Sequence, residues 1–190
     1  MVKVIVVYHS GYGHTKKQAE AVLAGAAGVS GVDARIFAVG DIGETEWAEL
    51  DNADAIVFGT PTYMGNASAD FKKFSEASSK VWYQQKWKNK IAGGFTNSAS
   101  LNGDKGSTIQ WLITLAMQHS MIWVGPGLMP ANSSKATRND VNYLGGYSGA
   151  LAQSPSDLGP DAGPLPGDLE TARLYGERLA QVSKQFKAQA

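Results

Sequence analysis

Short segments of continuous apolar residues recur along the chain and predict buried β-strands. They are rich in β-branched and aromatic side chains, and their apolar positions follow one another without alternating polar ones. Such runs are typical of strands that are buried on both faces, as in a parallel sheet covered by helices. The predicted strands are residues 2–8, 34–39, 55–59, 91–95 and 121–124.

Segments with helical spacing separate these strands, and one more follows the last strand. Their apolar residues recur every three or four positions, which places them on one face of a helix. The four stripes are Ala19, Val22, Leu23 and Ala26, ended by Gly28; Phe71, Phe74, Ala77 or Ser78, and Val81; Ile109, Leu112, Ile113 and Ala116; and Leu169, Ala172, Tyr175, Leu179, Val182 and Phe186, with Asp168 as the expected N-cap. Strands that alternate with helices predict an α/β protein with a doubly wound, five-stranded parallel sheet and helices on both faces.

Residues 125–167 break this alternation. No strand or helix is evident there, and six of the seven prolines lie in this segment. Loops of this length are usually functional or disordered. A surface insertion is one interpretation, but the glycine and apolar content around residues 144–147 favours a loop that packs against another part of the protein. We expect a single domain over residues 1–190, with this insertion after the fifth strand.

The composition excludes several classes of protein. Seventeen basic and seventeen acidic residues cancel, so no basic excess points to nucleic acid. Cysteine is absent, which excludes disulfides, thiolate metal sites and cysteine nucleophiles. No apolar run approaches the roughly 20 residues of a membrane helix, and the N-terminus has no signal-peptide pattern. We expect a cytoplasmic protein that binds neither membranes nor nucleic acid.

Three predicted strands end in segments rich in small and hydroxyl side chains, at residues 9–15, 59–66 and 96–100. The first opens a helix, where backbone N–H groups and the helix dipole favour an anion, and Ser10 and Thr15 add hydroxyl groups. By itself, that segment is equally consistent with an ordinary turn that needs its glycines. In open α/β sheets, however, ligands bind outside the carboxyl ends of the strands. Three such segments at one edge therefore predict a ligand site.

The histidines and tryptophans are further candidates for site residues. His9, His14 and His119 do not have the spacing of metal ligands, so no metal site is expected. Tryptophans belong more often to a core or an interface than to a ligand site. Trp82 is the exception we select, because it lies at a predicted helix end beside polar residues.

At these segments the sequence resembles the flavodoxin-like superfamily, and within it the WrbA-type NAD(P)H:quinone oxidoreductases. The resemblance covers almost the whole chain. It rests on Tyr8-x-Ser10-x-Tyr12-Gly13-His14, Phe58-Gly-Thr-Pro-Thr62, Gly65-Asn66, His119-Ser-Met121, Gly145-Gly146 and Ala172-Arg173-x-x-Gly176-Glu177. A generic flavodoxin has neither the Gly-Thr-Pro-Thr motif nor the long loop.

The resemblance implies FMN as the cofactor and assigns each segment a role. Residues 10–15 would hold the phosphate, residues 60–65 and 96–102 would line the flavin ring, and His119 would approach its edge across a subunit interface. Tyr12 would lie near the nicotinamide, and Trp82 would shape the substrate pocket. The implied cofactor contacts are Ser10, Gly11, Tyr12, Gly13, His14, Thr15, Thr60, Pro61, Thr62, Tyr63, Met64, Gly65, Thr96, Asn97, Ser98, Ala99, Ser100, Leu101, Asn102 and His119. No catalytic acid or base of the chain itself is expected, because the flavin carries the chemistry.

The resemblance also implies a two-electron transfer from NAD(P)H to small quinones by a homodimer or homotetramer. Exposed aromatic residues such as Trp82 and Trp87 would be covered in that assembly. An alternative is a flavodoxin-like electron carrier, but the neutral net charge disfavours it because docking between redox proteins usually needs a charged face. A regulatory partner protein is a third alternative, which no sequence feature supports. Tyr63-Met64 replaces the Arg-Phe pair usual in this family, so the preference for nicotinamide and acceptor stays open.

Overall fold

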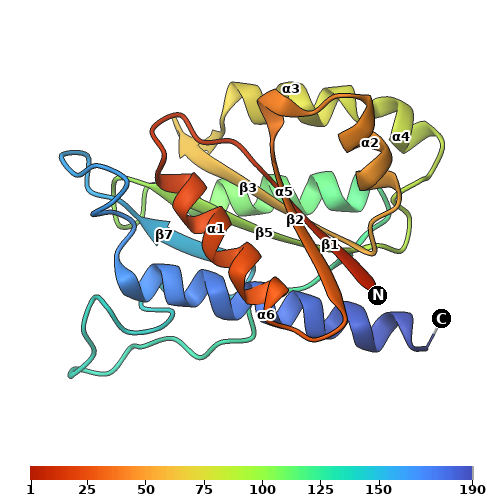
Figure 1. Cartoon of the computed structure of the whole chain (residues 1–190). Coiled ribbons are helices and arrows are strands. Elements are labelled where there is room, and N and C mark those ends of the chain that lie inside the picture. The colour runs from red at the N-terminus through yellow and green to blue at the C-terminus, as the bar shows by residue number, and fades with distance from the viewer. Residues whose placement is uncertain (190) are drawn as a thin grey trace.

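A parallel sheet lies at the centre of the computed structural model, which describes residues 1–189 (Figure 1). Its strand order is β2-β1-β3-β5-β6, and all neighbours on this path are parallel. These strands are β1 (Val2–Tyr8), β2 (Val32–Ala38), β3 (Ala55–Tyr63), β5 (Ile91–Ser98) and β6 (Ile122–Trp123). The short β4 (Asn66–Ala67) pairs antiparallel with β3, and β7 (Ala150–Gln153) pairs parallel with β5. The predicted doubly wound parallel sheet is confirmed.

Helices cover both faces of this sheet (Figure 1). The pair α1 (His14–Ala27) and α6 (Pro166–Lys187) covers one face. The other face is covered by α2 (Glu44–Asp51), α3 (Ala69–Ala77), α4 (Ser79–Tyr83) and α5 (Lys105–Gln118). A short 3₁₀-helix, Val39–Asp41, follows β2.

Alternation along the central strands divides the core into two clusters. Val4 and Val6 of β1 join the cluster under α1 and α6, whereas Ile5 and Val7 join the cluster on the opposite face. All four side chains are fully buried, as continuous apolar runs in a two-sided sheet require. Both clusters share one sheet, which supports our proposal that the chain is a single domain.

Two glycines explain the motif found in the last helix. A Cβ at Gly176 would lie 1.9 Å from the Val22 carbonyl oxygen, and one at Gly25 would lie 1.8 Å from the Arg173 carbonyl oxygen. Only glycine therefore permits the close contact between α1 and α6. This contact fixes the position of the α1 N-terminus, where the first predicted site segment lies.

Several predicted boundaries are wrong in ways that concern the site. β3 continues to Tyr63 and β5 to Ser98, so residues 60–62 and 96–98 are strand and not loop. Polar residues extend these strands because their hydroxyl groups find partners in neighbouring strands and helices. α2 was not predicted, since its eight residues bury only Leu50 and carry little apolar pattern.

The largest correction concerns the insertion, which interrupts the fifth strand instead of following it. β6 pairs with the start of β5 at Ile91, and β7 pairs with its end at residues 95–98. The short, small-residue sequence of β7 gave no strand signal. Asp168 is also not an N-cap, because α6 begins at Pro166 and the Asp168 side chain is buried within its first turn. Within residues 1–189, no helix is long and apolar enough to cross a bilayer.

Candidate functional site

A cleft of about 590 Å³ lies at the carboxyl ends of β1, β3 and β5. Its lining residues are Ser10, Tyr12, His14, Thr15, Pro61, Thr62, Tyr63, Asn97, Ser98, Ala99, Ser154, Ser156, Leu158, Gly159 and Pro160. Ten of these fifteen belong to the three segments selected from the sequence, so the fold brings those segments together. The other five come from the insertion and were not predicted.

The α1 N-terminus forms one end of the cleft and suits an anion. Gly13 is its N-cap with a φ of 86°, no side chain caps the first turn, and no acidic residue lies there. The Ser10 hydroxyl oxygen is buried and has no hydrogen-bond partner among the described residues. Thr15 is also buried and lines the same cleft. Free backbone N–H groups and an unpartnered hydroxyl together favour a negatively charged ligand group.

Residues 154–164 of the insertion pack over this end of the cleft. The His14 Nδ1–H donates to the Gly163 carbonyl oxygen at 2.9 Å. Lys17 forms an ion pair with the exposed Asp161 at 3.0 Å, and the hydrogen bond between them raises the pKa of Lys17. Pro160 lies against Gly13, where a Cβ would be 3.0 Å from its ring. The only sequence signal for this role was the hydroxyl-bearing Ser-Pro-Ser at residues 154–156.

Threonine hydroxyls connect β3, β5 and α5 behind the cleft. Thr62 Oγ1 lies 2.8 Å from both Thr96 Oγ1 and Thr108 Oγ1, and the Thr96 hydroxyl donates to the Thr60 carbonyl oxygen at 2.7 Å. These side chains satisfy one another. Thr60 and Thr96 are buried and do not line the cleft, so they shape its wall from behind.

Two tyrosines form the outer rim. Tyr12 is 76% exposed and lies edge-on to Tyr63, with 6.2 Å between ring centroids. The Tyr63 hydroxyl lies over Gly11, where a Cβ would be only 2.6 Å away, so a larger residue at position 11 would displace the end of the Tyr63 side chain. Burial raises the pKa of Tyr63. Met64, in the turn before β4, is fully exposed, and the rim therefore carries aromatic and apolar groups where the family's usual pair has a charge.

A buried lysine holds the segment that follows β5. Lys105 is 1% exposed, and its ammonium donates to the carbonyl oxygens of Ser100, Leu101 and Asn102 at 2.6, 2.9 and 3.3 Å. Burial lowers the pKa of Lys105 to about 8. A cation in the first turn of a helix opposes the helix dipole, and this unusual placement was the sequence signal that we missed.

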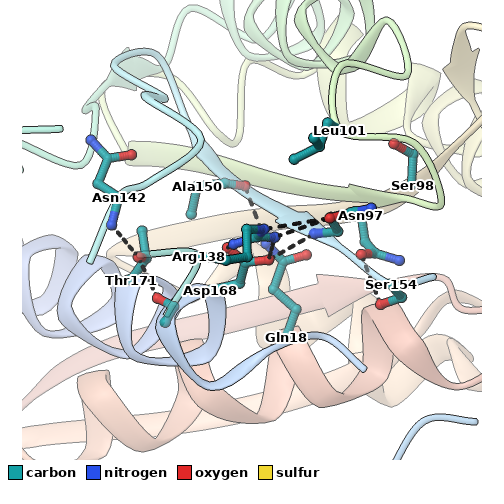
Figure 2. Close-up of polar contacts among 12 residues, drawn as sticks. Gln18, Asn97, Ser98, Leu101, Arg138, Asn142, Ala150, Ser154, Asp168 and Thr171 are labelled. Carbon is teal, nitrogen blue, oxygen red and sulfur yellow. Dashed lines mark hydrogen bonds and ion pairs between the residues drawn. The ribbon is translucent and has the colours of Figure 1, made fainter. Parts of the chain in front are cut away.

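A second set of hydrogen-bonded side chains, which involves the insertion, also supports the segment that follows β5 (Figure 2). The Gln153 side-chain amide donates to the Ala99 carbonyl oxygen at 2.9 Å. The Gln153 backbone N–H donates to Asp168 at 2.8 Å, and Asp168 forms an ion pair with Arg138 at 2.6 Å. Figure 2 also shows Ser154 beside Asn97, where the serine hydroxyl donates to the amide oxygen at 3.1 Å. The insertion is thus tied to the end of β5.

The structure does not bring His119 to the cleft. It follows α5 at the opposite edge of the sheet, where the next residue, Ser120, accepts a hydrogen bond from the Asn89 backbone N–H just before β5. Its ring is 3% exposed, contacts Trp87 with 4.4 Å between ring centroids, and pairs with Ser78. His119 therefore does not reach the cleft of its own subunit, and its expected approach to the flavin edge across a subunit interface stays a prediction.

Some other candidates also lie outside the cleft lining. Trp82, on α4, is 44% exposed but does not line it, and Trp87 is fully buried, so the expectation that Trp87 is exposed is wrong. Thr60, Thr96 and His119 are described above. The other predicted residues that do not line the cleft are Gly11, Gly13, Met64, Gly65, Ser100, Leu101 and Asn102. Each of these adjoins a lining residue in sequence or continues its segment.

Sequence comparisons identify relatives along nearly the whole chain. The sequence model of the NADPH-dependent FMN reductase family matches residues 2–135. Flavodoxin FldP of Pseudomonas aeruginosa (strain UCBPP-PA14) is 50% identical over 99% of this chain and 100% of its own. A protein named NAD(P)H dehydrogenase (quinone) from Solidesulfovibrio magneticus is 30% identical over 98% of this chain and 100% of its own.

Structural comparison gives the same grouping. The flavodoxin, WrbA-like protein from Agrobacterium tumefaciens is 48% identical, with a TM-score of 0.76 over 97% of this chain and 99% of that chain. A flavodoxin from the domain Archaea has a TM-score of 0.62 at 20% identity, over 96% of this chain and 99% of that chain. At that identity the likeness shows the fold alone.

Proposed function

Because the chain belongs to the NADPH-dependent FMN reductase family, as a WrbA-type flavodoxin-like protein that binds FMN, we propose that it transfers two electrons from NAD(P)H to small quinones. When bound, FMN supplies the hydride chemistry, while the protein binds and orients the reactants. The residues of the cleft fit this cofactor, because the unpartnered Ser10 hydroxyl and the open α1 N-terminus suit a phosphate group.

The two ends of the cleft would bind different parts of the cofactor. The backbone amides of residues 11–15, with the Ser10 and Thr15 hydroxyls, would hold the phosphate. The wall formed by Pro61, Thr62 and residues 97–99 would line the ring. Leu158 and Pro160, from the insertion, would exclude water from the phosphate end. A volume of about 590 Å³ is within the range typical of cofactor sites.

The observation that carries the proposal is the uncharged, aromatic character of the cleft mouth. None of the lining residues is Lys, Arg, Asp or Glu. The exposed Tyr12 and Tyr63 rings offer flat apolar surfaces on which a neutral quinone or a nicotinamide can stack. We further propose that both substrates use this one mouth in turn.

A second candidate function is electron transfer between protein partners, which the 50% identity to a protein named flavodoxin supports. An electron carrier depends on a separate reductase and does not oxidise NAD(P)H by itself. Steady-state oxidation of NADH and NADPH with benzoquinone therefore separates the two candidates. Turnover with the purified protein alone supports the oxidoreductase. Absence of turnover, with FMN bound and reducible by dithionite, would leave the carrier as the better proposal.

A binding experiment tests the site itself. The purified protein should bind FMN near stoichiometrically and FAD much more weakly, because the α1 N-terminus and the Ser10 hydroxyl suit a terminal phosphate dianion, which FAD lacks. Thr15→Asp should weaken FMN binding more than Thr15→Ala does, since the new carboxylate repels the phosphate dianion. Thr45→Asp, on the exposed surface of α2, is a matched control that should leave the affinity unchanged. Equal affinities of the two Thr15 variants would refute the phosphate assignment.

A further inference from the structure

Four consecutive carbonyl groups after β5 accept hydrogen bonds from two side chains outside their segment. Gln153 binds the Ala99 carbonyl oxygen, and the Lys105 ammonium binds those of Ser100, Leu101 and Asn102. Gln153 lies on β7 and Lys105 on α5, so both donors belong to other elements of the fold. The Ser98 hydroxyl also donates to the Ser100 carbonyl oxygen at 3.1 Å. Lys105 and Gln153 are thus the donors outside the segment that set the direction of these peptide groups.

The matching N–H groups must point the other way. In a trans peptide the carbonyl of one residue and the N–H of the next lie in one plane and are antiparallel. The N–H groups of residues 100–103 therefore face away from Lys105 and Gln153. Among the residues that the structure describes, none of these four N–H groups donates a hydrogen bond. Ser98 and Ala99 of the same segment line the cleft.

The buried ammonium of Lys105 costs folding free energy, so a purely structural role explains this residue poorly. Its ammonium is removed from water and lies at the positive end of a helix dipole, and both effects disfavour a cation. Lys105, Arg138 and Asp168 together carry a net charge of +1, because the one carboxylate of Asp168 faces both cations. This positive charge lies directly behind the segment that follows the cleft wall.

We propose that Lys105, together with Gln153, is a positioning residue that turns the amides of residues 100–103 toward the acceptor atoms of the flavin ring. This inference rests on the proposed function, because it places the ring beside this segment. The ring carries carbonyl oxygens and nitrogens that accept hydrogen bonds, and reduction increases the negative charge on them. Aligned amide dipoles backed by a buried cation therefore favour the reduced cofactor more than the oxidised one.

The test removes the ammonium and keeps an unbranched, uncharged side chain that is one atom shorter. Lys105→Met and wild type are titrated with FMN and with riboflavin, which lacks the phosphate, and binding is followed by flavin fluorescence. We expect Lys105→Met to weaken both flavins by the same factor, at least tenfold. Thr15→Asp should weaken FMN only. This pattern separates loss of ring contacts from loss of phosphate contacts.

Lys90→Met is the matched control. Lys90 also places its ammonium on backbone carbonyl oxygens, those of Asp51 and Ala53, but at the amino edge of the sheet, away from the cleft. Its replacement removes a similar interaction without touching the proposed ring site. We expect flavin affinities within twofold of wild type.

The reduction potential gives a readout that a general loss of stability would not move. Lys105→Met should lose affinity for reduced FMN more than for oxidised FMN, which shifts the midpoint potential of the bound cofactor to lower values. A tenfold difference between the two losses corresponds to about 30 mV for a two-electron couple. Lys90→Met should keep the wild-type potential.

Two results would overturn the inference: flavin affinities and potential equal to those of Lys90→Met, or a loss confined to FMN. If Lys105→Met does not fold, Lys105→Gln and Gln153→Leu decide in the same assays, and unchanged riboflavin affinity in both overturns it. A wild-type protein that binds riboflavin but oxidises no NAD(P)H would contradict the oxidoreductase proposal and leave the role of Lys105 standing. A wild-type protein that binds neither flavin would overturn both.

Discussion

Removing the imidazole of His119 should change how the protein responds to acid and leave its cofactor site intact. The Ser78 hydroxyl already donates to the Ser75 carbonyl oxygen at 2.6 Å, so His119 Nε2 carries the proton of the 2.9 Å contact with Ser78. The other nitrogen, Nδ1, is buried and has no partner among the described residues. Protonation would place an unpaired cationic N–H in the core. Burial accordingly lowers the pKa of His119 to about 4.

The size of the effect follows from this shift. The unfolded chain binds the proton near pH 6.5 and the folded chain near pH 4. Stability from neutral His119 is therefore complete above pH 6.5 and is lost progressively as the pH falls through this window. Each pKa unit corresponds to about 1.36 kcal/mol, so the full loss is about 3 kcal/mol, of which about 2.5 kcal/mol is lost by pH 4.5.

Urea unfolding of the FMN-loaded protein, followed by circular dichroism, measures this effect at pH 7 and pH 4.5. His119→Gln keeps a donor for Ser78 but does not titrate. Carboxylates contribute equally to both proteins, so the wild type should lose about 2.5 kcal/mol more than the variant between the two pH values. Parallel losses would refute the buried, neutral state. A tenfold loss of FMN affinity at pH 7 would instead support the flavin contact that the family resemblance implies.

Three further predictions concern the cofactor and the assembly. FMN affinity should fall as the pH rises through about 8, because a neutral Lys105 amine, faced only by Asp168 and Arg138, donates fewer hydrogen bonds; titrations should show no such fall for Lys105→Met. Light scattering should show a homodimer or homotetramer, since Trp82 and Tyr83 leave an apolar surface on α4; a 20.1 kDa monomer with FMN bound would contradict this. Double-reciprocal plots should be parallel and excess quinone should compete with NAD(P)H, because one cleft serves both substrates; intersecting lines would indicate two sites.

The fold was largely predictable because its determinants are local. Buried parallel strands need continuous apolar runs, and four of the five runs became strands of the predicted parallel sheet. The fifth strand is divided between β6 and β7, and this division has no local cause. β7 forms because Ala150 and Ala152 fit the space beside the end of β5, which sequence spacing does not reveal.

The site was predictable to the extent that turn chemistry determines it. Small and hydroxyl residues after β1 and along the ends of β3 and β5 marked three walls of the cleft. The fourth wall, residues 154–160, depends on the path of the insertion back to the α1 N-terminus. Lys105 and Gln153 lie 48 residues apart in the sequence, and they are connected through the segment after β5, to whose carbonyl oxygens both donate hydrogen bonds. The burial of His119 outside the cleft of its own chain was not predictable, because a family motif conveys which residue recurs and says nothing of its burial here.

The absence of charge from the cleft lining bears on both proposed functions. A phosphate dianion at the α1 N-terminus would be held by amides and hydroxyls. Lys17, a cation near this turn, is already paired with Asp161. Under the role proposed for Lys105 and Gln153, the amides that these side chains orient beside the ring would add to the affinity for FMN. The same lack of charge disfavours a mouth that recruits protein partners by electrostatic attraction, which decays with salt and needs a charged face. Small planar molecules need no such face, because the exposed tyrosines offer them stacking surface directly.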